Sequence, residues 1–141
     1  EGLSSRLFEF SEFLVQVLGI TDVGGKLKGD VTYHECCHLK RELGISSQPR
    51  ALIKGVKGIN FVELDQSDVC CGFGGTFAIK YPDISGAILE QKIRNIKSSG
   101  ADILVANDTS CLMHMTGSFS RLGVEIEAMH IAQFLDKAME D

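Results

Sequence analysis

Cysteine and glycine gather in one short stretch of this chain, residues 69–85. Cys70 and Cys71 lie side by side near its start, and three glycines fall within the next four positions. Glycine lets the backbone adopt positive φ and approach a bound group closely. Thiolates are the ligands that soft metal ions and iron–sulfur clusters select, whereas phosphate sites and oxygen-ligated sites need no sulfur. The stretch therefore predicts a loop that contacts a metal ion or a cluster.

The other sulfur atoms follow the same pattern. The chain has five cysteines, and four of them form the adjacent pairs Cys36–Cys37 and Cys70–Cys71, with Cys111 as the fifth. A secreted disulfide framework would have an even number of better separated cysteines. A single buried cysteine is usually an inert small hydrophobe. Two adjacent pairs and a fifth cysteine instead favour a common site.

The composition limits the class of protein. A length of 141 residues is enough for one domain, and 44% hydrophobic and 23% charged residues are typical of a soluble globule. No apolar run approaches the ~18 residues that a membrane span needs, and no segment resembles a signal peptide. The net charge of −5, with scattered lysines and arginines, argues against nucleic acid or an anionic membrane as the main partner. Because the first residue is Glu1, we expect an excised piece or a processed chain.

Hydrophobic periodicity at the start of the chain predicts an amphipathic helix over residues 3–18. Ser4 or Ser5 suits its N-cap, and Gly19 follows its end. Its apolar stripe consists of Leu7, Phe10, Leu14, Val17 and Leu18. The glycine-rich segment at residues 21–30 is predicted to be a loop.

The rest of the chain alternates apolar runs with helical patterns. Strands are predicted at residues 31–35, 59–64, 103–106 and 124–129. The first helix after the strand at residues 31–35 has Pro49 in its first turn and ends near Gly55 or Gly58. The second runs from Pro82 to Gly100, and its core face contains Ile84, Ile88, Ile93 and Ile96. The third starts at Asp108 or Ser110 and reaches Leu122, and the last contains Ile131, Phe134, Leu135, Ala138 and Met139.

This order predicts an α/β fold, with a four-stranded parallel sheet, helices on both faces and right-handed crossovers. We expect residues 1–30 to form an N-terminal helix and loop, and residues 31–141 to form a single α/β domain. Each group of cysteines follows a predicted strand. In a parallel sheet they would meet at the carboxyl edge, where open α/β sheets bind their ligands.

Two nucleotide-binding motifs fail on inspection. The third glycine of G-x-G-x-x-G would fall at Phe77, and the loop lacks the immediate strand–turn–helix context of that motif. The chain also has no Walker sequence ending in Gly-Lys-Ser/Thr. The glycine loop is therefore not predicted to bind a nucleotide.

Two other kinds of chemistry stay open at this point. Zinc takes four nitrogen or sulfur ligands, and Cys111 with His114, or Cys37 with His38, could contribute some of them. A nucleophilic thiol at Cys70 or Cys71 would need only one sulfur and an activating histidine. Of the remaining histidines, His34 and His130 lie at element ends, where a structural hydrogen-bonding role is expected.

Three blocks of sequence resemble the cysteine-rich CCG domain of iron–sulfur oxidoreductases. The first block is residues 33–44, around Cys36, Cys37 and His38. The second is residues 70–77, followed by Lys80, Pro82, Ile84 and Ser85. The third comprises Gly100, Ala101, Asp102, Asn107, Asp108 and residues 111–113. The pattern is most similar to the second CCG repeat of the lactate-utilisation and glycolate oxidase iron–sulfur proteins. It is related to the CCG-containing subunit of heterodisulfide reductase.

The resemblance implies an electron-transfer module with an iron–sulfur cluster, expected to be 4Fe-4S. By position, its ligands would be Cys37, Cys70, Cys71 and Cys111, with Cys36 as a spare or alternative ligand. Backbone amides of Gly72, Gly74 and Gly75 could donate hydrogen bonds to the cluster sulfides and tune its potential. No residue is assigned as a catalytic acid, base or nucleophile.

The chain departs from that family in two respects. The heterodisulfide reductase pattern ends in C-x-x-C, but this chain has His114 at the last position, so a four-cysteine centre is expected in place of a five-thiolate one. Family members carry two CCG repeats and this chain carries one, which implies half of a larger subunit. The resemblance further implies partner subunits with flavin or iron–sulfur centres, oxidation of a 2-hydroxy acid, and a cytoplasmic location, peripheral to the inner membrane through those partners.

Overall fold

Four parallel strands form the centre of the molecule. The computed structural model describes residue 2 and residues 6–140. The strands are β1 (Lys26–His34), β2 (Lys57–Phe61), β3 (Ile103–Ala106) and β4 (Glu127–His130), in the order β2-β1-β3-β4. Every neighbouring pair is parallel, which confirms the predicted α/β class.

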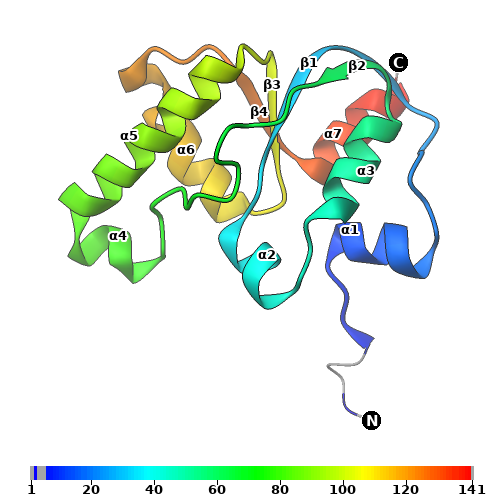
Figure 1. Ribbon diagram of the computed structural model, residues 1–141, viewed down its shortest axis with the longest axis horizontal. Helices are drawn as coiled ribbons and strands as arrows, with labels where there is room; N and C mark the ends of the chain where they lie inside the picture. Colours follow the sequence, from blue (N-terminus) through cyan, green and yellow to red (C-terminus); the bar gives the residue numbers. More distant parts are fainter. Residues whose placement is uncertain (1, 3–5, 141) are drawn as a thin grey trace.

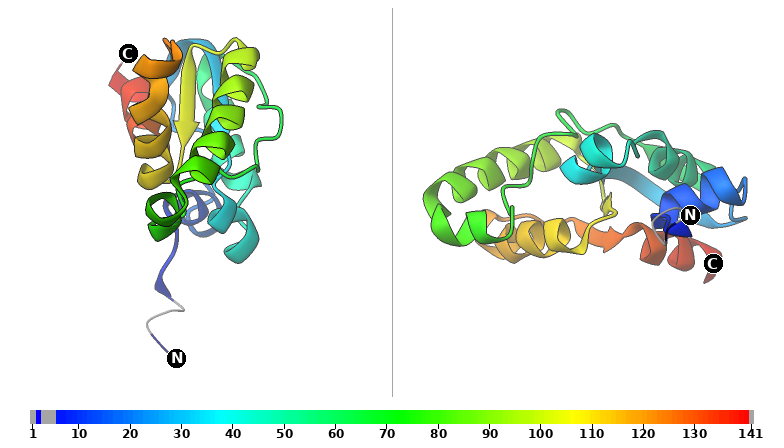
Figure 2. Two further views of the ribbon diagram at one scale, coloured as in Figure 1. Left: turned by 90° about the vertical axis from the view of Figure 1, so that its left-hand side faces the viewer. Right: turned by 90° about the horizontal axis from the view of Figure 1, so that it is seen from below.

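Helices cover both faces of this sheet (Figures 1 and 2). After β1 come α2 (Cys37–Glu42) and α3 (Ser47–Gly55), and after β2 come α4 (Thr76–Lys80) and α5 (Pro82–Ser99). The last two are α6 (Thr109–Leu122) and α7 (Ile131–Glu140). In Figure 1, α3 and α7 lie on one side of the strands and α5 and α6 on the other.

The alternation of side chains along the strands explains this division. Successive residues of a strand point to opposite faces. Tyr33 and Val105 pack with α3 and α7 in one buried cluster, whereas Leu104 and Ala106 pack with α5 and α6 in a second one. Because β3 is buried on both faces, all four of its residues are apolar.

The direction of the chain reverses between β1 and β3. From β1 the chain passes to β2 on one side, and then returns to β3 on the other side. Such a switch point opens a crevice outside the carboxyl ends of the two strands. His34 and Ala106 are register partners and end β1 and β3 at the same level. The segments that follow these two strands therefore start beside each other.

The strand boundaries differ from the prediction at β1, β2 and β4. Residues 26–30, predicted as loop, belong to β1, which starts at Lys26 and pairs there with Lys57 of β2. Backbone pairing needs no apolar side chains, so this part of the strand has no hydrophobic signal. β2 is shorter than predicted at its end, and β4 begins at Glu127 instead of residue 124.

The N-terminal helix was predicted too long. It comprises α1 (Phe10–Glu12) and continues as the π-helical turn η2 (Phe13–Val17). Glu9 is its N-cap, because its carboxylate accepts hydrogen bonds from two backbone amides of the first turn. The proposed caps Ser4 and Ser5 lie outside the described residues.

The predicted apolar stripe of that helix is mostly exposed. Leu14 packs against the buried cluster that contains residues of α3 and α7, but Leu7, Phe10, Val17 and Leu18 are exposed. Leu7 precedes the helix, and the wider π turn breaks the 3.6-residue period on which the prediction depended. Ile84 of α5 is also exposed, because the first turn of this 18-residue helix extends beyond the short strands (Figure 1).

A buried ion pair connects β1 to the segments around it. Glu35, 1% exposed, accepts hydrogen bonds from Arg50 of α3 (2.8 Å) and from Ser46, and it forms an ion pair with Lys40. Arg50 also binds Glu63 and the Ser67 hydroxyl. Burial raises the pKa of the Glu35 carboxyl, but its hydrogen bonds outweigh burial and hold the pKa below its usual value. This network fixes the end of β1 relative to the chain beyond β2.

We predict that Arg50→Met destabilises the fold by about 2–4 kcal/mol, because it leaves the Glu35 carboxylate buried with fewer partners. Urea unfolding at neutral pH measures the change. Arg94→Met is the control, since Arg94 is exposed and bonds only to the neighbouring Gln91 in the described structure, and its expected effect is about 0.5 kcal/mol or less. Equal losses in the free energy of unfolding would show that the buried ion pair stabilises the fold no more than an exposed arginine does.

Candidate metal centre

Three separate segments deliver the five cysteines to the carboxyl edge of the sheet. Cys36 is the N-cap of α2, and Cys37 is the first residue of that helix. Cys70 and Cys71 lie in the loop between β2 and α4. Cys111 lies in the first turn of α6, where Asp108 is the N-cap and accepts a hydrogen bond from the Cys111 amide. All three segments follow a strand of the parallel sheet.

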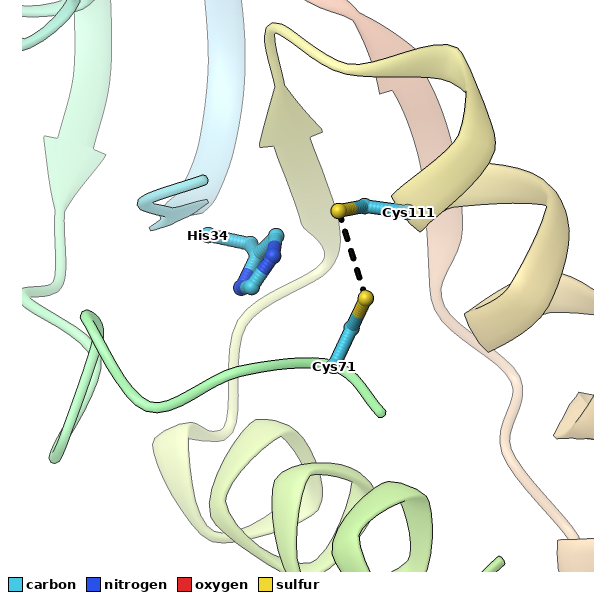
Figure 3. Close-up of side chains that lie close together, drawn as sticks. All are labelled: His34, Cys71 and Cys111. Carbon is cyan, nitrogen blue, oxygen red and sulfur yellow. Dashed lines mark hydrogen bonds between the residues drawn. The ribbon is translucent and has the colours of Figure 1, made fainter. Parts of the chain in front are cut away.

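Three of the sulfur atoms are buried together. The Sγ atoms of Cys71 and Cys111 are 3.2 Å apart, and those of Cys111 and Cys36 are 3.9 Å apart. Cys36, Cys71 and Cys111 are each less than 10% exposed, and none of the five cysteines forms a disulfide. Figure 3 shows Cys71 from the loop and Cys111 from α6 pointing toward each other.

The remaining two cysteines, Cys37 and Cys70, lie at the border of this cluster. Both are half-buried. Cys70 accepts a hydrogen bond from the Gly72 amide (3.3 Å). Of the ligands implied by the family resemblance, the structure thus brings Cys71 and Cys111 into direct contact. It adds Cys36 to them, and it leaves Cys37 and Cys70 at the rim.

His34 joins the buried sulfur atoms. It is the last residue of β1 and is fully buried, and a ring nitrogen lies within 4.8 Å of the sulfur atoms of Cys71 and Cys111 (Figure 3). The sequence prediction gave His34 a structural hydrogen-bonding role, but neither ring nitrogen has a hydrogen-bond partner in the described structure. Burial lowers the pKa of the imidazole, and the contact with Cys71 opposes this shift. One feature of the sequence could have indicated that His34 belongs to the site. His34 lies near the end of a predicted strand, two residues before Cys36.

The other histidines have partners. His38 Nδ1 lies 3.1 Å from Cys36 Sγ and 3.7 Å from an Asp108 carboxylate oxygen, and these three residues form a second group of potential ligands. His130 contacts the carbonyl oxygen of Asn107 at 2.9 Å and accepts a hydrogen bond from the Ala132 amide.

His114 is half-buried on α6, at the position where the heterodisulfide reductase pattern has its last cysteine. It lies 3.4 Å from the Ser85 hydroxyl, and its ring contacts Phe73. The structure therefore places His114 beside the glycine loop.

Contacts between the thiols shift their pKa values in opposite directions. Hydrogen bonds from Cys111 and Cys70 hold the pKa of Cys71 well below its usual value. Hydrogen bonds with Cys36 and Cys71, with burial, raise the pKa of Cys111, and the hydrogen bond with Cys71, with burial, raises the pKa of Cys70. Cys111 also lowers the pKa of Cys36 to about 7, assisted by amides of the first turn of α2. The cluster therefore favours thiolates at Cys71 and Cys36, the form that binds metal.

The spacing of these donors suits a metal. Two thiolates on one tetrahedral ion with metal–sulfur bonds of about 2.3 Å lie roughly 3.8 Å apart. The observed sulfur separations of 3.2 and 3.9 Å bracket that value. A hollow of about 500 Å³ lined by Lys26, Lys57 and Gly58 lies at the opposite, amino-terminal end of β1 and β2, far from this donor set.

Comparison with known proteins agrees with the three blocks of sequence. Residues 31–116 match the family model of the CCG cysteine-rich domain. The chain belongs to the CCG cysteine-rich domain family. The expected family is therefore confirmed.

Curated relatives of this CCG domain are longer proteins. Lactate utilization protein A of Lysinibacillus sphaericus is 44% identical over 136 residues, which is 96% of this chain and 60% of that protein. Lactate utilization protein A of Macrococcus caseolyticus is 46% identical over 138 residues, 98% of this chain and 56% of that protein. The chain thus spans less than two thirds of each relative. Among the described residues, no helix combines the length and apolar character needed to cross a membrane.

The glycine loop of the CCG domain depends on positive φ angles at Gly72, Gly74 and Gly75. Gly72 is the most restricted of the three, because a Cβ there would lie 2.6 Å from the backbone oxygen of Ser85. The Ser85 hydroxyl in turn donates a hydrogen bond to the Gly72 carbonyl (2.8 Å). The loop is therefore pressed against α5 directly after Cys71.

Two side chains of α5 hold the segment before the cysteines. The Lys92 ammonium is fully buried and donates hydrogen bonds to the carbonyls of Gln66 and Ser67, and Asn95 donates one to Asp65. Burial lowers the pKa of Lys92 to about 8, although the charges of Asp68 and the nearby cysteines oppose the shift. Lys92 thus stabilises a loop with no secondary structure of its own.

We predict that Gly72→Ala destabilises the CCG domain by more than about 2 kcal/mol, because the methyl group meets fixed backbone. Gly123→Ala is the matched control: Gly123 adopts the left-handed α conformation (φ 61°, ψ 51°) and no atom lies within 4 Å of an added Cβ, so only backbone strain of about 1–2 kcal/mol is expected. Urea unfolding of the two variants measures the difference. A smaller loss at Gly72 than at Gly123 would contradict the close approach.

We also predict a pH dependence from Lys92. Its pKa is lower in the folded state than in the unfolded state, so the unfolded chain binds more protons between pH 8 and 10.5 and stability rises with pH there. The wild type should gain about 2 kcal/mol relative to Lys92→Met between pH 7.5 and 9.5 under reducing conditions. Urea unfolding at both pH values tests this, and a constant difference would mean that the lysine pKa is not lowered.

Proposed function

We propose that this CCG domain binds an iron–sulfur centre and transfers electrons in the oxidation of a 2-hydroxy acid, lactate or glycolate. One observation carries the proposal: sulfur atoms of Cys36, Cys71 and Cys111, from three distant segments, lie together at the switch point without forming a disulfide. Thiolates from three segments that each follow a strand of one sheet suit a cluster better than they suit a single reactive thiol.

The proposed ligands are Cys37, Cys70, Cys71 and Cys111, with Cys36 as an alternative to Cys37. When bound, a 4Fe-4S centre would accept and release single electrons. The protein holds the thiolates in place, and the buried positions of Cys71 and Cys111 exclude water. The Gly72 amide, which already donates to the Cys70 sulfur, would tune the potential through that bond. No acid or base is needed for this role.

The names of the relatives support lactate as the proposed substrate. Proteins named Lactate utilization protein A are similar over almost the whole chain, yet the chain spans only 60% or less of those cited. We therefore propose a second CCG domain in the remainder of the subunit, and partner subunits that carry flavin or further iron–sulfur centres. The assembly is proposed to be cytoplasmic and peripheral to the inner membrane through those partners.

Zinc is the second candidate, because the structure offers a specific donor set for it. Cys71, Cys111 and His34 offer two sulfur atoms and one nitrogen atom within 4.8 Å of one another, and Cys36 Sγ lies 3.9 Å from Cys111 Sγ as a further sulfur donor. In that case the domain would be a zinc-stabilised interaction module instead of an electron carrier.

Anaerobic reconstitution with iron and sulfide tests the proposal. We predict a brown protein with stoichiometric iron and sulfide, and near-complete loss of both in Cys71→Ser and Cys111→Ser. Ala128→Ser is the control, since Ala128 packs against the same buried cluster but contributes no sulfur. Iron and sulfide content and the visible absorption spectrum are the measurements.

Two outcomes would contradict the electron-transfer proposal. Tight binding of zinc without uptake of iron and sulfide would support the interaction module. Rapid alkylation of one cysteine at neutral pH, with loss of a turnover that needs no metal, would support a thiol-dependent enzyme.

A further inference from the structure

His34 is a buried polar group that the fold itself does not satisfy. Its exposure is 0%, and both Nδ1 and Nε2 lack a hydrogen-bond partner among residues 2 and 6–140. A buried donor or acceptor without a partner costs about 1–3 kcal/mol, and such groups in native proteins usually have a functional explanation. The sulfur atoms of Cys71 and Cys111 lie within 4.8 Å of a ring nitrogen but do not meet hydrogen-bond geometry with it, so this cost points to a partner that protein atoms do not supply.

The other three histidines differ from His34 in this respect. His130 uses both ring nitrogens, His38 contacts Cys36, and His114 contacts Ser85. His38 and His114 are also at least partly exposed, so water is accessible to them. Burial and two unsatisfied nitrogens therefore coincide at one histidine, and it is the one beside Cys71 and Cys111.

The position of His34 on the sheet gives its ring a fixed direction. His34 lies opposite Ala106 in the parallel ladder, so its backbone is held by the central strand pair β1–β3. Its side chain shares the face of the sheet on which Leu104 and Ala106 pack against α5 and α6. In Figure 3 the ring lies next to the Cys71–Cys111 contact. A ligand on a strand is positioned more rigidly than one on a loop.

We propose that His34 is a nitrogen ligand of the metal centre, together with Cys71 and Cys111 and in place of one of the half-buried thiolates, Cys37 or Cys70; this inference rests on the proposed function. Imidazole and thiolate are both ligands of iron and zinc in proteins. An imidazole in place of a thiolate removes one negative charge from the ligand set, and mixed histidine–cysteine ligation raises the potential of iron–sulfur centres. His34 would thus make this centre easier to reduce than one with cysteine ligands alone.

Histidine variants of the whole chain test the proposal after anaerobic reconstitution. His34→Gln should reduce retained iron at least tenfold. His34→Cys, which offers a thiolate, should restore iron and sulfide, lower the reduction potential and remove the nitrogen coupling seen by pulsed EPR in protein labelled with ¹⁵N-histidine. His130→Gln is the matched control and should retain iron, sulfide and the nitrogen coupling of the wild type.

Several results would overturn the assignment. One is wild-type iron, sulfide and nitrogen coupling in His34→Gln. Another is failure of His34→Cys to restore the centre, which would make His34 a packing residue. Circular dichroism of the metal-free proteins decides the same point, since loss of folding in both His34 variants would also show a packing role.

The proposed function and this inference can fail separately. If the wild type takes up no iron and sulfide, the electron-transfer proposal fails, and the same variants are then titrated with Zn²⁺ against a chelator. A ligand role still predicts at least tenfold weaker zinc binding for His34→Gln and recovery in His34→Cys. Equal zinc affinity of the wild type and His34→Gln would overturn the inference.

Discussion

The common end point of β1 and β3 is the constraint on which the site depends. Parallel pairing places His34 opposite Ala106, and the chain leaves these two strands at the same edge of the sheet. It reverses direction between them, so that α2 and α6 begin on either side of one crevice. Cys36 and Cys111 occupy the beginnings of these helices. Sulfur atoms 75 residues apart in the chain thereby come within 3.9 Å.

The third contribution to the site comes from a loop that needs external support. Residues 62–75 contain neither helix nor strand, yet they carry Cys70 and Cys71. Buried polar side chains hold this loop: Lys92 binds two of its carbonyls, and Arg50 binds Ser67 while pairing with Glu35. Buried charges are costly unless they are paired and hydrogen-bonded. Here the charged side chains of Lys92 and Arg50 fix a loop that has no regular backbone hydrogen bonding of its own.

The fold could be predicted where local signals were strong. Residues 103–106 form a short apolar run between polar residues and are a strand as predicted, and α5 lies between Pro82 and Gly100 because proline suits a first turn and glycine a C-cap. The start of β1 could not be predicted, because its pairing with β2 uses the backbone of a polar, glycine-containing segment. The π turn of the N-terminal helix broke the periodicity that the prediction assumed.

The candidate site was predictable in its location but not in its details. Cysteines after successive strands of a parallel sheet must approach one edge, and the sequence reveals that order. It does not reveal which member of an adjacent pair points inward, and the structure buries Cys36 more deeply than Cys37. Nor does it show that His34 lacks a hydrogen-bond partner, because that depends on residues from distant segments.

The central claim is that these distant sulfur atoms share one metal centre. Anomalous diffraction at the iron absorption edge, from crystals grown anaerobically after reconstitution, tests it most directly. We expect iron density within bonding distance of both Cys71 Sγ and Cys111 Sγ. Iron bound only at a surface site remote from these two sulfur atoms would contradict the claim.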